Sequence, residues 1–393
     1  MLNSVASTTS GDLGTVLTAI DNLPANSDVQ NAYKQISPEK ANALPTLSFA
    51  SANLQTRTLA QRFTSLRFAD KGMTAPGNLG SFSMNFSRAE GIMLAYNGSD
   101  LSSLFAGKKA KAKENENRWS LFAEAGVAFG NQKTSVNQTG YDFTVAGLTA
   151  GVDLRLRDHL LVGLASGYSH TGTGFHGSGG GVEANTLPLN AYAAYFPGSF
   201  YAYGSLGYAL NLFNLERGIN FGGLSRTARS STTGHQFNAY GETGYDLDLK
   251  RFILTPIASL SYSSLWVDAF TEQDAGSLNL KVAAQSAASL QSGVGGRLTV
   301  PLKLGQVRVV PQAYASYQHE FSNDSRGLDA RLNQGSSTFT FKTDSPKRDF
   351  AVVGGTIVAG LTKNLTAQVN YNVEVGRGNY TAHYVNAGLR LEF

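Results

Sequence analysis

Residues 237–249, FNAYGETGYDLDL, alternate between two kinds of side chain along their whole length. The odd positions are mostly apolar or aromatic, while the even positions include Asn238, Glu242 and Asp246. Successive side chains of a β-strand point to opposite faces of the sheet. The run therefore predicts a strand with one apolar face and one polar face.

Eleven further segments carry the same alternation, so the sequence predicts twelve strands. Most are longer than the roughly 5–6 residues typical of strands in globular proteins, and their length suits a tilted membrane span of about 9–11 residues or more. The segments are 118–130, 141–156, 159–171, 183–196, 200–214, 235–249, 251–266, 281–301, 306–321, 348–361, 364–376 and 381–393.

The connections between these segments alternate in length. Short connections at 157–158, 197–199, 250, 302–305 and 362–363 alternate with long ones at 131–140, 172–182, 215–234, 267–280, 322–347 and 377–380. Outer-membrane barrels have short periplasmic turns and long extracellular loops, whereas a soluble sandwich has no reason to sort its loops. We therefore expect an all-β transmembrane barrel of about twelve antiparallel strands. An even number of strands closes the sheet and leaves no edge in lipid, which predicts a monomeric barrel in the outer-membrane bilayer.

The polar faces of the strands carry charges that a dry core would not tolerate. Those charges are compatible with a barrel only if the polar face lines a water-filled lumen, so we expect these residues to line the lumen and to contact any linker inside it. They are Glu124, Asp153, Glu242, Asp246, Arg297, Arg308, Glu320, Glu374 and Arg390.

Aromatic residues gather toward the strand ends, as expected for girdles at the two membrane–water interfaces. The expected girdle residues are Trp119, Phe129, Tyr168, Tyr195, Phe200, Phe252, Trp266, Tyr317, Phe321, Phe350 and Tyr384.

The composition excludes several classes of function. The chain has 393 residues, 15% of them charged, a net charge of +4 and no Cys, which rules out a disulfide scaffold, a thiolate metal site and a Cys nucleophile. No basic patch is evident, so we expect no nucleic-acid partner. No stretch reaches the ~20 apolar residues of a spanning helix, and no signal peptide is visible at Met1. We expect the chain to begin downstream of its native start.

The sequence of residues 1–117 predicts a separate, mainly helical segment. Apolar spacing predicts short helices near 14–23 and 27–36, a third beginning near 37–40, and the longest helix at 50–68. Arg57, Arg62 and Arg67 are distributed around that longest helix and suit a lumen lined by acids. We expect residues 50–68 to occupy the lumen, with residues 87–104 as the alternative. Residues 107–117 form a charged linker, and the barrel follows at 118–393.

Residues 118–393 resemble the translocator, or β-domain, of an autotransporter of the type V secretion family. The resemblance rests on residues 142–153, 319–326 and 388–393, and residues 12–70 are similar to the helical region that often precedes this barrel. It implies a twelve-stranded barrel in the Gram-negative outer membrane, filled by a helical linker, without a cofactor. It also implies an N-terminal passenger that reaches the cell surface. The chain departs from the family pattern because it lacks a signal peptide and a recognisable passenger.

The last strand adds one more implied partner. Its alternating run ends at the C-terminus, with Leu389, Leu391 and Phe393 on one face. These residues resemble the terminal signal that the barrel-assembly machinery reads in this family.

Catalysis is the competing interpretation. Outer-membrane phospholipases and proteases use His near the membrane surface, and His170, His176, His235 and His319 fall near the extracellular strand ends in the predicted map. None lies in a recognisable motif, and no His and carboxylate pair has metal-ligand spacing. Some family members cut their linker with lumenal acids and an Asn, but no matching Asn can be assigned. We expect no catalytic residue and no metal.

The sequence leaves three functions open. The first is an autotransporter translocator that exports its N-terminal passenger. The second is a stand-alone porin-like or adhesive barrel that uses the long connections 215–234 and 322–347. The third is an outer-membrane hydrolase.

Overall fold

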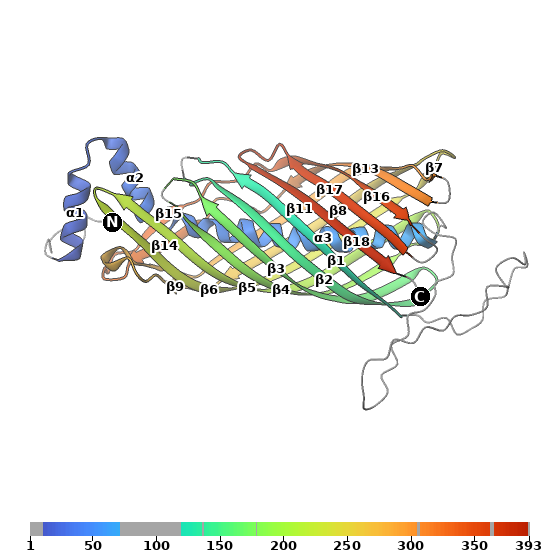
Figure 1. Ribbon diagram of the computed structural model, residues 1–393, viewed down its shortest axis with the longest axis horizontal. Helices are drawn as coiled ribbons and strands as arrows, with labels where there is room; N and C mark the ends of the chain where they lie inside the picture. Colours follow the sequence, from blue (N-terminus) through green and yellow to red (C-terminus); the bar gives the residue numbers. More distant parts are fainter. Residues whose placement is uncertain are drawn as a thin grey trace, which may run out of the picture.

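Twelve long strands form a closed antiparallel barrel with a helix along its axis (Figure 1). The computed structural model describes residues 11–70 and 119–391, apart from 136, 178, 305–306 and 362–364. The barrel strands are β1 (Trp119–Gln132), β2 (Tyr141–Arg157), β3 (Leu160–Phe175), β4 (Gly180–Tyr195), β5 (Phe200–Phe221), β6 (Leu224–Tyr245), β8 (Ile253–Val267), β11 (Gln285–Thr299), β13 (Val307–Glu320), β16 (Asp349–Gly360), β17 (Leu365–Val375) and β18 (Tyr380–Leu391). The predicted barrel is confirmed.

The first and last strands close the barrel. β1 pairs antiparallel with β18, with Ala125 opposite Ala387, and the other neighbours follow the chain order. Two short strands, β7 (Leu247–Asp248) and β12 (Leu302–Leu304), extend pairs at the end where the short turns lie. We call this the short-turn end and the opposite one the long-loop end. Closure leaves every barrel strand with two partners, so no edge would meet hydrocarbon.

The two faces of the barrel differ as the alternation predicts. Outward side chains such as Leu148 and Leu164 are 56% and 55% exposed, whereas the inward Asp153 is 1% exposed. Nine of the eleven expected girdle aromatics are exposed on the outer face. Phe350 and Tyr384 are the exceptions, because both are buried and face the lumen in phase with Val352 and Asn386. Their assignment to the girdle was wrong, since a girdle residue must share the phase of the apolar face.

Three predicted loops, 215–234, 267–280 and 322–347, contain regular structure. Residues 215–234 are not a loop, because β5 and β6 continue beyond the neighbouring strands and meet at Gly222 and Gly223. Both glycines have positive φ, 55° and 79°, as a tight two-residue hairpin turn requires. The segment 322–347 contains β14 (Gly327–Leu332) and β15 (Phe339–Lys342). The predicted strand 281–301 also splits, because its first residues form β10 (Leu280–Val282) outside the barrel.

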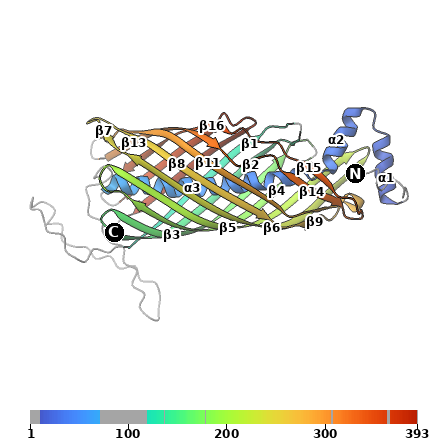
Figure 2. The ribbon, with the colours of Figure 1, turned by 180° about the vertical axis from the view of Figure 1, so that it is seen from behind.

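A second, four-stranded sheet lies at the long-loop end. Its order is β15-β14-β10-β9, where β9 is Phe270–Thr271, and the short helix η4 (Gly276–Leu278) connects β9 to β10. Three N-terminal elements lie at the same end, namely α1 (Asp12–Asp21), α2 (Asn26–Ile36) and η2 (Glu39–Asn42). Figure 2 shows α1, α2, β9, β14 and β15 together at one end of the barrel from behind.

The helix inside the barrel is α3 (Ala43–Asp70), which is longer than the expected 50–68. It enters at the long-loop end and runs toward the short-turn end, contacting β1–β6, β8 and β18 (Figure 1). None of the described helices is both long and apolar enough to cross a bilayer. The alternative lumen helix, 87–104, lies outside the described residues.

Candidate functional site

The contact between α3 and the lumen wall is the candidate site, and three arginines make its ion pairs. The guanidinium nitrogen of Arg57 lies 3.3 Å from a carboxylate oxygen of Glu374, that of Arg62 lies 2.8 Å from Asp153, and that of Arg67 lies 3.1 Å from Asp246. The arginines are five residues apart, and five residues turn an α-helix by about 140°. The three side chains therefore reach β17, β2 and the β6–β7 junction in different directions.

Each of these guanidinium groups also lies over an aromatic ring of the wall. Arg57 lies 4.4 Å from the ring centroid of Tyr384, Arg62 lies 4.8 Å from that of Phe122, and Arg67 lies 4.0 Å from that of Tyr201. A planar guanidinium stacks on an aromatic face while its edge donates to a carboxylate. The wall thus presents three sites of the same kind, each with one acid and one ring.

The wall also carries arginines of its own. Arg297 on β11 lies 3.3 Å from Glu242 on β6, and the Tyr201 hydroxyl donates to the same carboxylate at 2.7 Å. Arg377, in the β17–β18 turn, lies 3.1 Å from Glu374 and 3.3 Å from Glu320. Glu374 therefore joins the helix to the wall, because it pairs with Arg57 and Arg377 together.

Three further residues were expected to line the lumen, and the described contacts place each in a different part of the wall. Glu124 is buried and accepts a hydrogen bond from the Gln368 amide at 3.1 Å. Arg308 is half-buried on β13 near the short-turn end. Arg390 lies on β18 opposite Thr366, and Leu389 and Leu391 pair there with Ala367 and Leu365. Phe393 lies outside the described residues.

An aromatic layer in the lumen was missing from the sequence interpretation. Phe63 of α3 packs against Tyr192 and Tyr203, with ring centroids 5.3 and 4.8 Å apart. Strand phase could have revealed these tyrosines, since Tyr203 lies directly opposite the inward Glu242 and opposite residues share a face. The lumen wall is therefore both acidic and aromatic, which suits a helix without a single apolar stripe.

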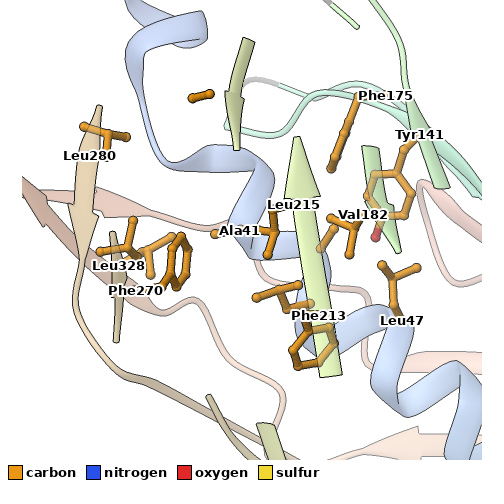
Figure 3. Packing of buried hydrophobic residues seen from close by; sticks show 14 of the residues in the cluster. Ala41, Leu47, Tyr141, Phe175, Val182, Phe213, Leu215, Phe270, Leu280 and Leu328 are labelled. Carbon is orange, nitrogen blue, oxygen red and sulfur yellow. The ribbon is translucent and has the colours of Figure 1, made fainter. Parts of the chain in front are cut away.

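The long-loop end is closed by a cap that consists of α1, α2, η2 and the loops around them. Figure 3 shows Ala41 and Leu47 among buried side chains of the barrel and loops, including Phe213, Leu215 and Phe270. Arg217 of β5 donates to the backbone oxygen of Gln35 at 2.5 Å. The cap therefore covers the end of the lumen where α3 begins.

Charged groups of the cap are tied to neighbouring loops. Lys40 donates to the backbone oxygen of Gly179, and burial lowers the pKa of its ammonium to about 8. Burial also raises the pKa of Glu39, whose carboxylate accepts from the Thr139 hydroxyl. Hydrogen bonds from Arg226 hold the pKa of Asp12 well below its usual range.

Of the histidines considered for a hydrolase, His170, His235 and His319 lie on the outer face of β3, β6 and β13, and His176 directly follows β3. His176 pairs with Asp142 at 3.0 Å, His319 with Asp349 at 2.7 Å, and His235 with the Tyr208 hydroxyl at 2.6 Å. His170 is hydrogen-bonded to the Asn185 amide oxygen at 3.0 Å. Within the described ranges, no three His, Asp or Glu side chains converge as metal ligands would.

Comparison with known families agrees with the barrel. The model of the family described as "Autotransporter beta-domain" matches residues 121–372, which is more than half of the chain. The chain belongs to this family. The autotransporter assignment makes it an outer-membrane barrel of type V secretion, and the barrels of this family are generally not catalysts.

Three relatives place this β-domain in longer proteins. It is 24% identical to the extracellular serine protease of Serratia marcescens, over 72% of this chain and 26% of the protease. It is also 24% identical to the esterase EstA of Pseudomonas aeruginosa, over 71% of this chain and 44% of EstA. Outer membrane protein A of Rickettsia conorii is 24% identical over 68% of this chain and 14% of its own length. The chain thus spans less than half of these relatives.

Solved autotransporter barrels share the fold. The translocator domain of NalP from Neisseria meningitidis superposes with a TM-score of 0.56 at 15% identity, covering 71% of this chain and 90% of NalP. The β-domain of Bordetella BrkA superposes with a TM-score of 0.50 at 21% identity, covering 70% of this chain and 99% of BrkA.

Proposed function

We propose that this β-domain exports an N-terminal passenger across the outer membrane and retains α3 in its lumen afterwards. One observation carries the proposal: α3 follows the lumen from the long-loop end, and its three arginines pair with the wall. Long loops lie outside the cell in outer-membrane barrels. A segment that precedes α1 would therefore lie at the cell surface.

The chemistry of the lumen supports passage of a polypeptide. A wall of carboxylates, hydroxyls and aromatic rings hydrogen-bonds and stacks without requiring one side-chain sequence. A helix satisfies its own backbone donors and acceptors, so it can rest in a narrow lumen at low cost. The proposed work is thus insertion, passage and closure, without a catalytic residue in this chain.

The proposal includes three partners. The lipid bilayer contacts the apolar outer face of a monomeric barrel. The barrel-assembly machinery recognises the last strand through Leu389, Leu391 and Phe393. The passenger is the third partner, and its activity belongs to the segment that it carries.

Epitope accessibility on intact cells tests this proposal. A secretion signal and an epitope are joined to the N-terminus of the full chain, and a matched variant carries the epitope in the short turn 197–199. We expect antibody to label the N-terminal epitope on intact cells and the turn epitope only after permeabilisation. Both variants must show the heat-dependent gel shift of a folded barrel. The reverse labelling pattern would refute export in this direction.

Pore conductance separates export from the porin-like alternative. With α3 in place, the described lumen is occupied, so the refolded chain should conduct poorly in planar bilayers. A chain that lacks residues 43–70 should conduct strongly. High steady conductance of the intact chain would favour an open porin.

A further inference from the structure

The four-stranded sheet at the long-loop end has one buried face and one accessible face. Phe270, Val282, Leu328 and Ala330 are buried in the cap core. Since successive side chains alternate, Thr271, Lys281, Asp329 and Arg331 share the opposite face. This second face has no part in the lumen contact or in the core of the cap.

Two cations are placed directly opposite each other on that face. In the register between β10 and β14, Lys281 lies opposite Arg331, and Thr271 of β9 lies opposite Lys281. Like charges at directly opposed positions destabilise a sheet. Among the described residues, neither cation takes part in an ion pair, and Arg331 donates one hydrogen bond, to the backbone oxygen of Gly335 at 3.3 Å. The sheet therefore holds two positive charges together, and no carboxylate in the described ranges lies at ion-pair distance from either.

A cavity of about 300 Å³ opens beside this pair. Half of its lining residues are polar, namely Lys281, Arg331, Thr271, Thr338 and Asp329, and the other half are apolar, namely Ala269, Phe270, Val282, Ala283 and Ala330. The Asp329 carboxylate accepts a hydrogen bond from the Thr340 hydroxyl on the neighbouring strand β15. The cavity therefore combines two cations, two hydroxyls and one carboxylate with an apolar part, and its volume is at the small end of the size range of ligand pockets.

We propose that this cavity binds a phosphorylated saccharide. The planar Arg331 guanidinium can hold phosphate through two hydrogen bonds, and the Lys281 ammonium adds a second charge. Thr271 and Thr338 are neutral donors and acceptors for sugar hydroxyls. Asp329 accepts hydrogen bonds from hydroxyls, while its charge disfavours a bare phosphate in the same place. The volume exceeds the needs of phosphate alone and fits one sugar unit.

The location of the cavity allows two sources of such a ligand. The connections β8–β11 and β13–β16 supply the sheet, and both leave the barrel at the long-loop end. The sugar phosphate could belong to a glycolipid anchored in the surrounding leaflet or to a soluble saccharide. Both sources present the same chemistry to Lys281 and Arg331.

Calorimetric titration of the refolded full chain tests the proposal. The detergent has polyoxyethylene headgroups, so it contributes neither sugar nor phosphate. The probes are glucose 6-phosphate, glucose and inorganic phosphate. We expect glucose 6-phosphate to bind at least tenfold more tightly than either other probe. Lys281→Gln and Arg331→Gln should each weaken its binding about tenfold, as expected for loss of a charge-assisted hydrogen bond.

Lys342→Gln is the matched control. Lys342 is an exposed cation on the adjacent strand β15, and it does not line the cavity. Its loss should change the affinity by less than twofold. Absence of binding to glucose 6-phosphate, equal binding of inorganic phosphate, or an equal loss in Lys342→Gln would each overturn the proposal for soluble sugar phosphates.

A stability measurement distinguishes ligand binding from a structural role. Because Lys281 and Arg331 repel each other, Lys281→Gln should melt at the same temperature as the parent chain or higher when no anion is present. A glucose 6-phosphate concentration that raises the melting temperature of the parent chain should not change the melting temperature of Lys281→Gln. A lower melting temperature in both buffers would indicate a structural lysine and contradict the proposal.

Nanodiscs identify the source. Parent chain and Lys281→Gln/Arg331→Gln are placed in discs with or without a phosphorylated glycolipid, and retained glycolipid is measured after purification. Retention by the parent and loss in the double variant indicate a lipid source. Equal retention by both, together with binding of glucose 6-phosphate, indicates a soluble source. Failure in both assays refutes the site.

Discussion

The lumen and the cap hold adjacent parts of one N-terminal segment with different chemistry. In the lumen, Arg57, Arg62 and Arg67 of α3 pair with wall acids and stack on wall rings. In the cap, Val16 and Ile36 of α1 and α2 are fully buried among apolar side chains. Polar pairs can exchange partners with water, whereas apolar burial is lost as soon as the surfaces separate. The lumen thus holds its helix mainly through polar pairs, and the cap holds its helices mainly through apolar burial.

Of the lumen substitutions, Arg62→Met should weaken the attachment of α3 most. Its pair with Asp153 is almost fully buried, with side chains 4% and 1% exposed. In Arg62→Met the buried Asp153 carboxylate loses the Arg62 cation, although it still accepts the hydrogen bond from the Tyr192 hydroxyl. Loss of one partner from a buried pair costs about 3–5 kcal/mol. We expect faster amide hydrogen exchange along α3 and higher conductance, while α1 and α2 keep their protection. If hydrogen exchange in α3 did not change, the ion pairs could not be the main contacts that hold α3 in the lumen.

Ile36 provides the corresponding test in the cap. Ile36→Ala removes a fully buried side chain of α2, which costs about 2–5 kcal/mol. Hydrogen exchange should accelerate in α1 and α2, with α3 little affected. Tyr33→Ala is the control, because Tyr33 lies on the same helix with 44% exposure. Simultaneous loss of protection in α3 would mean that cap and lumen form one cooperative unit.

Arg57 should have a smaller effect than Arg62. Its side chain is 21% exposed, and its partner Glu374 keeps a second cation, Arg377, at 3.1 Å. Removing Arg57 therefore leaves no unpaired acid, and we expect Arg57→Met to cost about 1 kcal/mol. Conductance and hydrogen exchange of Arg57→Met and Arg62→Met, measured side by side, check that the Arg57 substitution has the smaller effect. An effect of Arg57→Met equal to that of Arg62→Met would contradict the argument from shared partners.

Asp12→Asn should have the smallest effect on the stability of the cap, and the size of that effect should depend on pH. Hydrogen bonds from Arg226 lower the pKa of Asp12 from 3.8 in the folded cap. The stabilisation is therefore complete above about pH 4 and is lost as the pH falls toward the lowered folded-state pKa. Because the Asp12 side chain is 42% exposed, we expect less than about 1 kcal/mol. Hydrogen exchange of α1 at pH 5 and pH 3 should differ less in Asp12→Asn than in the parent chain.

Much of the barrel follows from strand phase alone. The alternation around Glu242 and Asp246 predicts which side chains face inward, since a strand has only two faces. The same phase assigns Tyr384 to the lumen, although its place near a strand end suggests the girdle. Residues 215–234 misled the prediction because their Ser, Thr and Gly content is also typical of loops, whereas pairing across 22 residues of each strand makes a hairpin.

The cap and the ion pairs could not be derived in this way. Asp12 meets Arg226, and Arg217 meets Gln35, across long separations in the chain. Such contacts depend on how far each strand is displaced along its neighbour when the barrel closes. The pairing of Lys281 with Arg331 likewise requires two different loops to form one sheet.

The sequence by itself determined the twelve strands, their inward and outward faces, and a long helix with dispersed arginines. The physical reason is local, because a period of two residues and the absence of Gly and Pro act within one segment. Only the tertiary structure decided which acid meets which arginine, how the cap closes the long-loop end, and where two loops place their cations side by side. Those contacts form only when the barrel closes, because closure brings segments that are far apart in the chain to neighbouring positions around the barrel axis.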